Sequence, residues 1–171
     1  IMGGPLGISL KGRTVGIVGL GGIGKALIHR LRPFNVKLIG IKQSNPEQAQ
    51  MQLNRHWVGT PDDLDILLEQ SDYVVLCLPL NHSSQGMINK KTLKLMKVNA
   101  FLINVSRGGL VDYAALKSAL KKKEIAGAGL YVFWEEPPDP TDEIFQYNIM
   151  ATPHIGGATD VSMQGIAESV A

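Results

Sequence analysis

Three side chains in the C-terminal part of the chain are of types that move protons and bind small anions. Arg107 lies in residues 104–109 (NVSRGG), Glu136 directly precedes two prolines, and His154 lies in residues 152–157 (TPHIGG). A guanidinium binds a carboxylate, an imidazole transfers a proton near neutral pH, and a carboxylate can orient that imidazole. These groups suit hydride transfer to or from a small keto or hydroxy acid, so all three are candidate catalytic residues.

A glycine-rich segment, residues 19–24 (GLGGIG), has the pattern of a loop that binds a dinucleotide pyrophosphate. It follows the apolar run at 14–18 and precedes a helical pattern, which is the context that such a loop requires. In this pattern Gly19 permits a tight turn, Gly21 lets the backbone approach the phosphates, and Gly24 allows close packing of helix and strand. The alternative is a glycine-rich turn that binds no ligand.

Short apolar runs alternate with helical patterns along the chain. We expect strands at residues 14–18, 36–41, 73–78, 101–105, 126–132 and 147–151. We expect helices at residues 23–31, 60–68, 90–96 and 113–121, and from Val161 onward, with Asp112 capping the fourth. The strands are apolar throughout, as in strands that helices cover on both faces. The pattern predicts an α/β fold with a doubly wound parallel sheet, Rossmann-like and in three layers.

Composition and charge exclude several classes of protein. The chain has 171 residues, 44% of them hydrophobic and 19% charged, as in one globular domain with a sizeable core. A formal net charge of +2 does not indicate a nucleic acid or an anionic membrane as partner. No apolar run approaches the about 20 residues of a membrane span, and no signal peptide is recognised. Cys77 is the only cysteine and no metal-ligand spacing occurs, so we expect a cytoplasmic protein without disulfides or a metal site.

Four motifs in order make the chain resemble the nucleotide-binding domain of the D-isomer-specific 2-hydroxyacid dehydrogenases. The motifs are residues 14–24 (TVGIVGLGGIG), 78–80 (LPL) with Gly86 downstream, 104–112 (NVSRGGLVD) and 153–159 (PHIGGAT). The resemblance covers nearly the whole chain, from about Gly4 to Ala171. The family includes D-lactate, D-3-phosphoglycerate, glycerate/hydroxypyruvate and formate dehydrogenases.

The resemblance implies a role for each candidate residue. Arg107 would bind the carboxylate and carbonyl oxygen of the substrate, His154 would act as acid and base, and Glu136 would orient His154. The implied cofactor-binding residues are Gly19, Gly21, Gly22, Ile23, Gly24, Lys42, Leu78, Pro79, Val105, Ser106, Tyr131, Gly156 and Gly157. Two positions depart from the family pattern, since Tyr131 replaces the usual Asp and Ser84 the usual Thr. We expect Tyr131 to alter the cofactor orientation or the pH profile.

Lys42 bears on the choice between NAD and NADP. An acid about 20 residues after the glycine loop normally binds the ribose 2′-hydroxyl of NAD. Here no acid follows the second strand until Glu47, and Lys42 stands in its place with Ser44 nearby. A cation and a hydroxyl suit a 2′-phosphate, so NADP is favoured. If Lys42 instead points to solvent, the site takes NAD or both.

The leading hypothesis is an oxidoreductase that transfers hydride between NAD(P) and a small D-2-hydroxy acid or its 2-oxo form. Residues 1–171 would be its single dinucleotide-binding domain, with the substrate domain outside this chain. Two alternatives stay open: a non-enzymatic NAD(H)-sensing scaffold of the C-terminal-binding co-repressor type, and another NAD-using enzyme such as adenosylhomocysteine hydrolase. The spacing of the three catalytic candidates argues against the second alternative but not the first. The resemblance also implies a homodimer and a small-molecule substrate.

Overall fold

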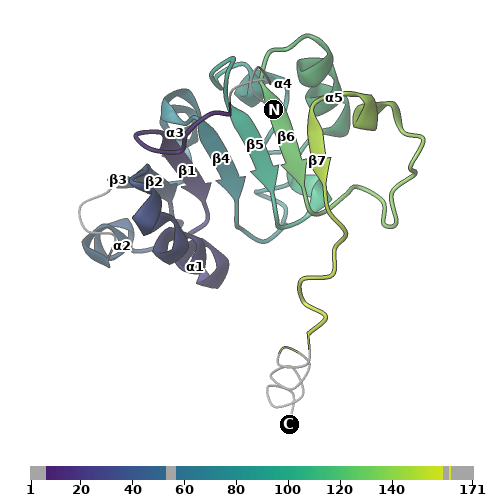
Figure 1. The fold of residues 1–171 in the computed structure, drawn as a ribbon. Coiled ribbons are helices and arrows are strands. Elements are labelled where there is room, and N and C mark those ends of the chain that lie inside the picture. Colours follow the sequence, from purple (N-terminus) through teal and green to yellow (C-terminus); the bar gives the residue numbers. More distant parts are fainter. Residues whose placement is uncertain (1–6, 53–56, 160–161, 163–171) are drawn as a thin grey trace.

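The fold is built on one parallel sheet of seven strands (Figure 1). The computed structural model describes residues 7–52, 57–159 and 162. The strands are β1 (Thr14–Val18), β2 (Lys37–Ile41), β3 (Trp57–Gly59), β4 (Tyr73–Leu76), β5 (Phe101–Asn104), β6 (Gly127–Leu130) and β7 (Ile149–Ala151). Their order is β3-β2-β1-β4-β5-β6-β7, and every neighbouring pair is parallel. Strand order reverses beside β1, so the expected doubly wound, Rossmann-like α/β fold is confirmed.

Helices lie on both faces of this sheet. They are α1 (Gly22–Leu31), α2 (Pro46–Gln52), α3 (Leu64–Gln70), α4 (Lys90–Leu93) and α5 (Tyr113–Lys121), with short 3₁₀ turns η1 (Arg32–Phe34), η2 (Pro61–Asp63), η3 (Gly108–Leu110) and η4 (Glu143–Gln146). Buried residues of α3, α4 and α5 share one core cluster with the sheet, and those of α1 and α2 share the other. In β1, Ile17 belongs to the cluster with α1 and α2, and Val18 belongs to the cluster with α3, α4 and α5. Because neighbouring residues of a strand point to opposite faces, the two clusters lie on opposite faces of the sheet. Of the described helices, none is long and apolar enough to cross a membrane.

The second face is covered unevenly. The cluster that α1 and α2 form contains residues of β1, β2, β3 and β4, whereas β5 contributes only the partly buried Ile103. On β7, Met150 is 74% exposed. The apolar strands predicted that helices cover both faces of the sheet. Within the described residues, this cover is incomplete over β5 to β7.

Several elements differ in extent from the sequence expectation. β4 ends at Leu76, β6 spans only Gly127–Leu130, and α4 ends at Leu93. The helix expected from residue 60 begins as the 3₁₀ turn η2 and becomes α-helical at Leu64. The elements α2 and β3 were not expected. The helix expected from Val161 onward lies outside the described residues, apart from residue 162.

All strands of a parallel sheet end at the same edge, which is the lower edge in Figure 1. The glycine loop follows β1 at this edge, and residues 77–80 follow β4. The turn that carries Arg107 follows β5, residues 131–148 follow β6, and the segment with His154 follows β7. The fold therefore gathers the candidate residues at the edge where open α/β sheets bind ligands.

Candidate active site

The glycine loop between β1 and α1 has the geometry that phosphate binding requires. Gly19 has a φ of +102°, and a Cβ there would lie 2.7 Å from the Cys77 carbonyl oxygen, so only glycine fits. A Cβ on Gly24 would lie 2.2 Å from the Gly19 carbonyl oxygen, so this glycine lets α1 pack against the loop. A Cβ on Gly21 would meet no atom within 4 Å. No described side chain caps α1, which leaves its first amides available to an anion.

Two adjoining grooves extend from the glycine loop along the carboxyl edge of the sheet. The first, of about 630 Å³, reaches Arg107 and is lined by Gly21, Gly22, Ile23, Cys77, Leu78, Pro79, Leu80, Val105, Ser106 and Arg107. The second, of about 390 Å³, reaches Lys42 and shares Gly21, Cys77, Leu78 and Pro79 with the first. A dinucleotide has two nucleoside halves on either side of its pyrophosphate. A groove on each side of the glycine loop fits that shape.

The turn after β5 is held by buried polar side chains. The Asn104 amide nitrogen donates to the Arg107 carbonyl oxygen at 2.9 Å, and its oxygen accepts from the Ser106 N–H at 3.1 Å. The Ser106 hydroxyl donates to the last carbonyl of β4 at 3.0 Å. Asn104 is 1% exposed and Ser106 7%, so these bonds form away from water and fix the backbone that carries Arg107.

The Arg107 side chain is exposed at the end of the first groove, and one guanidinium nitrogen, Nη1, donates to the Ser106 carbonyl oxygen at 2.7 Å. The next residue, Gly108, lies against the loop between β6 and β7. A Cβ on Gly108 would lie 2.1 Å from the Phe133 carbonyl oxygen, so only glycine permits this approach. The turn with Arg107 and the loop with Glu136 are therefore packed backbone to backbone.

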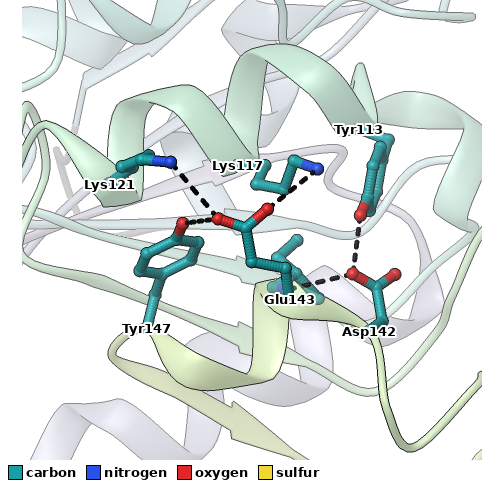
Figure 2. Close-up of polar contacts among 7 residues, drawn as sticks. Tyr113, Lys117, Lys121, Asp142, Glu143 and Tyr147 are labelled. Atoms are coloured by element: carbon teal, nitrogen blue, oxygen red, sulfur yellow. Dashed lines mark hydrogen bonds and ion pairs between the residues drawn. The ribbon is translucent and has the colours of Figure 1, made fainter.

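The loop between β6 and β7, residues 131–148, is anchored on both sides of Glu136. Before Glu136, the Trp134 indole N–H donates to the Val111 carbonyl oxygen at 2.6 Å. After Glu136, the Glu143 carboxylate points toward two lysines of α5 (Figure 2). It contacts Lys117 at 3.5 Å, Lys121 at 3.4 Å and the Tyr147 hydroxyl. The Trp134 bond and the two lysine contacts tie this loop to the body of the fold on both sides of Glu136, whereas the bond to Tyr147 lies within the loop.

Glu136 and His154 form a direct pair between the loops that follow β6 and β7. Glu136 Oε2 lies 2.9 Å from His154 Nδ1, and Oε1 accepts from the Phe133 N–H at 3.1 Å. The bond with the His154 ring, followed by the Phe133 amide and the Arg107 charge, holds the pKa of Glu136 below its usual value. Glu136 is therefore a carboxylate at neutral pH. A carboxylate at Nδ1 favours a proton on that nitrogen and leaves Nε2 to exchange a proton with a ligand.

The remaining predicted residues fall into two groups. Lys42, Leu78, Pro79, Val105 and Ser106 line the grooves with the glycine loop. Tyr131 and Gly156 line neither groove but contact each other, because the Gly156 N–H donates to the Tyr131 hydroxyl at 2.5 Å. Gly157 also lies outside both grooves, and its carbonyl accepts from the Ser162 hydroxyl. No hydrogen bond or ion pair in the described part of the chain joins Arg107 to Glu136 or His154.

Sequence reasoning missed residues that build or line the site. Asn104 and Gly108 shape the Arg107 turn, and Cys77, Leu80, Gln43, Asn81 and Ser83 line the grooves. A signal existed for Asn104, since a polar residue that ends an apolar strand commonly organises the following turn. Within the described residues, no group of His, Cys, Asp and Glu could hold a metal ion.

The comparisons with known proteins agree on one family. The model of the D-isomer specific 2-hydroxyacid dehydrogenase NAD binding domain matches residues 3–156. The glyoxylate reductase of Thermococcus litoralis is 46% identical over 97% of this chain and 49% of its own length. A glyoxylate reductase structure from Paecilomyes thermophila has a TM-score of 0.84 at 31% identity, covering 98% of this chain and 49% of that one. An NAD-complexed D-isomer specific 2-hydroxyacid dehydrogenase from Lactobacillus delbrueckii ssp. bulgaricus has a TM-score of 0.78 at 31% identity. The match covers 95% of this chain and 52% of that one.

The fold and the glycine loop thus define a dinucleotide-binding domain. The chain belongs to the D-isomer specific 2-hydroxyacid dehydrogenase family and corresponds to its NAD-binding domain, which confirms the resemblance found in the sequence. The chain spans about half the length of the Thermococcus relative.

Proposed function

We propose that the full protein is an NAD(P)-dependent oxidoreductase of small D-2-hydroxy acids and their 2-oxo forms, with residues 1–171 as its dinucleotide-binding domain. The observation that carries the proposal is the 2.9 Å pair between Glu136 and His154. This pair lies at the same sheet edge as Arg107 and the glycine loop. The co-repressor type of scaffold is the alternative. The name of the Thermococcus relative, a reductase, favours the enzyme.

Each side chain has one task in this reaction. Bound NAD(P)H supplies the hydride that reduces the carbonyl carbon. The Arg107 guanidinium binds the substrate carboxylate with two parallel hydrogen bonds, as a lysine could not. His154 Nε2 gives its proton to the carbonyl oxygen as negative charge develops there, and Glu136 stabilises the charged imidazole before that transfer. The substrate side chain would be recognised by the part of the protein outside this chain.

Turnover by the full-length protein tests the proposal. Oxidation of NADPH and of NADH is followed by absorbance with glyoxylate, hydroxypyruvate, pyruvate or phosphohydroxypyruvate. Glyoxylate is tested first because of the name of the Thermococcus relative. Oxidation with any of these acids supports the enzyme. Tight nucleotide binding without oxidation by any of them would favour the scaffold.

We further propose a preference for NADP over NAD. The second groove ends at Lys42, Gln43 and Ser44, directly after β2. The Lys42 N–H donates to the Gly59 carbonyl oxygen at 3.0 Å, which fixes the backbone at this point. The ammonium group and the Ser44 hydroxyl can both donate to a 2′-phosphate. The first acid after β2 is Glu47, in α2.

Replacing Lys42 by Asp should reverse this preference. The change removes a charged hydrogen bond to the 2′-phosphate and adds repulsion. We expect the ratio of the NADPH and NADH dissociation constants to shift roughly 100-fold toward NADH. Lys37→Asp is the matched control, since Lys37 is exposed at the opposite end of β2. Equal shifts in the two variants, or tighter binding of NAD than of NADP by the unchanged protein, would contradict the preference.

Two glycines of the loop should respond differently to replacement by alanine. For Gly24→Ala the new methyl collides with the Gly19 carbonyl oxygen at 2.2 Å, so the variant should lose about 1–3 kcal/mol of unfolding free energy. For Gly21→Ala the methyl has open space and φ is −78°, so stability should be unchanged. Because that methyl would obstruct the pyrophosphate, cofactor affinity should fall roughly tenfold. Thermal melts measure the stability of each variant, and nucleotide titration measures its cofactor affinity. Unaltered affinity in Gly21→Ala would mean that the phosphates bind elsewhere.

Assembly and location are also proposals. From the family resemblance we propose a homodimer, which sedimentation of the full-length protein would test. We propose the cytoplasm as its location because Cys77 is the only cysteine of the 171 residues, so they cannot form an internal disulfide. Burial raises the pKa of the Cys77 thiol to about 11, which keeps it protonated.

A further inference from the structure

Tyr131 is the first residue after β6 and lies beside the segment that carries His154. Its N–H donates to the Asn104 carbonyl oxygen at 3.0 Å, so its backbone is fixed to the end of β5. The side chain is partly buried. The segment that carries His154 begins after β7 and leaves the sheet (Figure 1), and Tyr131 lies at the end of the neighbouring strand β6.

Two contacts join Tyr131 to that segment. Its hydroxyl accepts from the Gly156 N–H at 2.5 Å. Its ring meets the His154 imidazole edge-on, with centroids 4.8 Å apart and planes at 68°. A Cβ on Gly156 would lie 2.8 Å from the Tyr131 hydroxyl oxygen, so glycine permits the approach. The phenol thus contacts both the backbone and the imidazole of one short segment.

The His154 segment needs such support because it has little of its own. Every residue from 151 to 159 is exposed. The Thr152 N–H donates to the Leu130 carbonyl oxygen at 3.0 Å, whereas the bonds from Ile155 to Pro153 and from Ala158 to Ile155, both 2.9 Å, lie within the segment. The bond that Nδ1 donates to Glu136 fixes one atom of the imidazole but leaves the ring free to rotate about that atom. The edge-on contact with Tyr131 restricts the plane of the ring.

We propose that Tyr131 is a positioning residue, which fixes the plane of the His154 imidazole with its ring and holds the His154 segment through the Gly156 amide. The inference rests on the proposed function, because His154 must be aimed at a substrate for its orientation to affect the rate. Glu136 then fixes the tautomer of the ring, and Tyr131 fixes the direction in which Nε2 points. A proton-transferring group held in this way loses rate when its geometry loosens.

The test compares three variants of the full-length protein: Tyr131→Phe, Tyr131→Leu and the matched control Tyr147→Phe. Tyr147 bonds to Glu143 in the remote cluster of Figure 2. Tyr131→Phe should speed hydrogen exchange of the Gly156 amide about tenfold, as expected for one lost hydrogen bond. Tyr131→Leu should also shift the ¹⁵N signals of the His154 ring. Tyr147→Phe should change neither.

Kinetics supply the second readout. With saturating cofactor, kcat should fall roughly tenfold in Tyr131→Phe and roughly 100-fold in Tyr131→Leu, while the cofactor dissociation constant stays within about twofold. Unchanged exchange at Gly156, or a kcat for Tyr131→Phe equal to that of Tyr147→Phe, would overturn the proposal. So would weaker cofactor binding at constant kcat. If the unchanged protein turns over no 2-oxo acid, the proposed function fails, and the exchange and ¹⁵N readouts still decide whether Tyr131 positions His154.

Discussion

Replacing His154 by Gln in the full-length enzyme is expected to lower kcat by about 10² to 10⁴-fold, the usual contribution of a positioned acid or base. Glutamine keeps a polar side chain of similar size that can still donate to Glu136. In the unchanged protein, Glu136 Oε2 lies 2.9 Å from His154 Nδ1. It cannot deliver a proton to the carbonyl oxygen. The loss should therefore appear in kcat, with the cofactor dissociation constant unchanged. Steady-state kinetics and nucleotide titration measure the two effects separately.

His29→Gln is the control for this substitution. His29 is exposed in the last turn of α1, and the same chemical change there should leave kcat unaffected. A His154→Gln enzyme with a rate within about threefold of the original would remove His154 from proton transfer, since such a role is worth at least about 10²-fold.

Replacing Arg107 by Leu is expected to reduce kcat/KM by roughly 10² to 10³-fold, mostly through a higher KM. The substitution removes both hydrogen bonds to the substrate carboxylate, and the loss of one partner of such a pair costs about 2–5 kcal/mol. Arg107→Lys retains the charge but not the forked geometry, so it should recover only part of the loss. Steady-state kinetics with the best 2-oxo acid would check that kcat/KM falls from the unchanged protein to Arg107→Lys and further to Arg107→Leu.

Arg30→Leu provides the matched control. Its Nη1 donates to the Ala26 carbonyl oxygen at 2.9 Å, much as Arg107 Nη1 donates to Ser106 at 2.7 Å, but on the surface of α1. Its removal should leave kcat/KM unchanged. If Arg107→Leu binds and reduces substrate as well as Arg30→Leu does, the substrate carboxylate is held elsewhere.

Local patterns were sufficient to predict most elements of the fold. β1 and α5 have the expected limits, Thr14–Val18 and Tyr113–Lys121. Asp112 caps α5 as expected, with its carboxylate accepting from the Ala115 N–H at 2.7 Å. Capping and hydrophobic periodicity act over a few neighbouring residues, so the sequence displays them directly.

The missed elements depend on distant partners instead. β3 has only three residues, too few to show a period, and it is a strand because Trp57 pairs with Ile39 of β2. α2 is largely polar and buries Ala49 in the cluster formed with α1 and the sheet. Such segments take their structure from tertiary contacts rather than from their own propensity.

The sequence by itself determined which chemical groups this domain can offer: the glycine loop, the guanidinium of Arg107, the carboxylate of Glu136 and the imidazole of His154. Only the tertiary structure decided which of them meet. Parallel pairing of β6 with β7 sets Leu130 opposite Ala151, and this register lets Glu136 reach His154 and Tyr131 reach Gly156. The physical reason is that residue type fixes what a group can donate or accept, whereas contacts between separate loops depend on how the strands beneath them align.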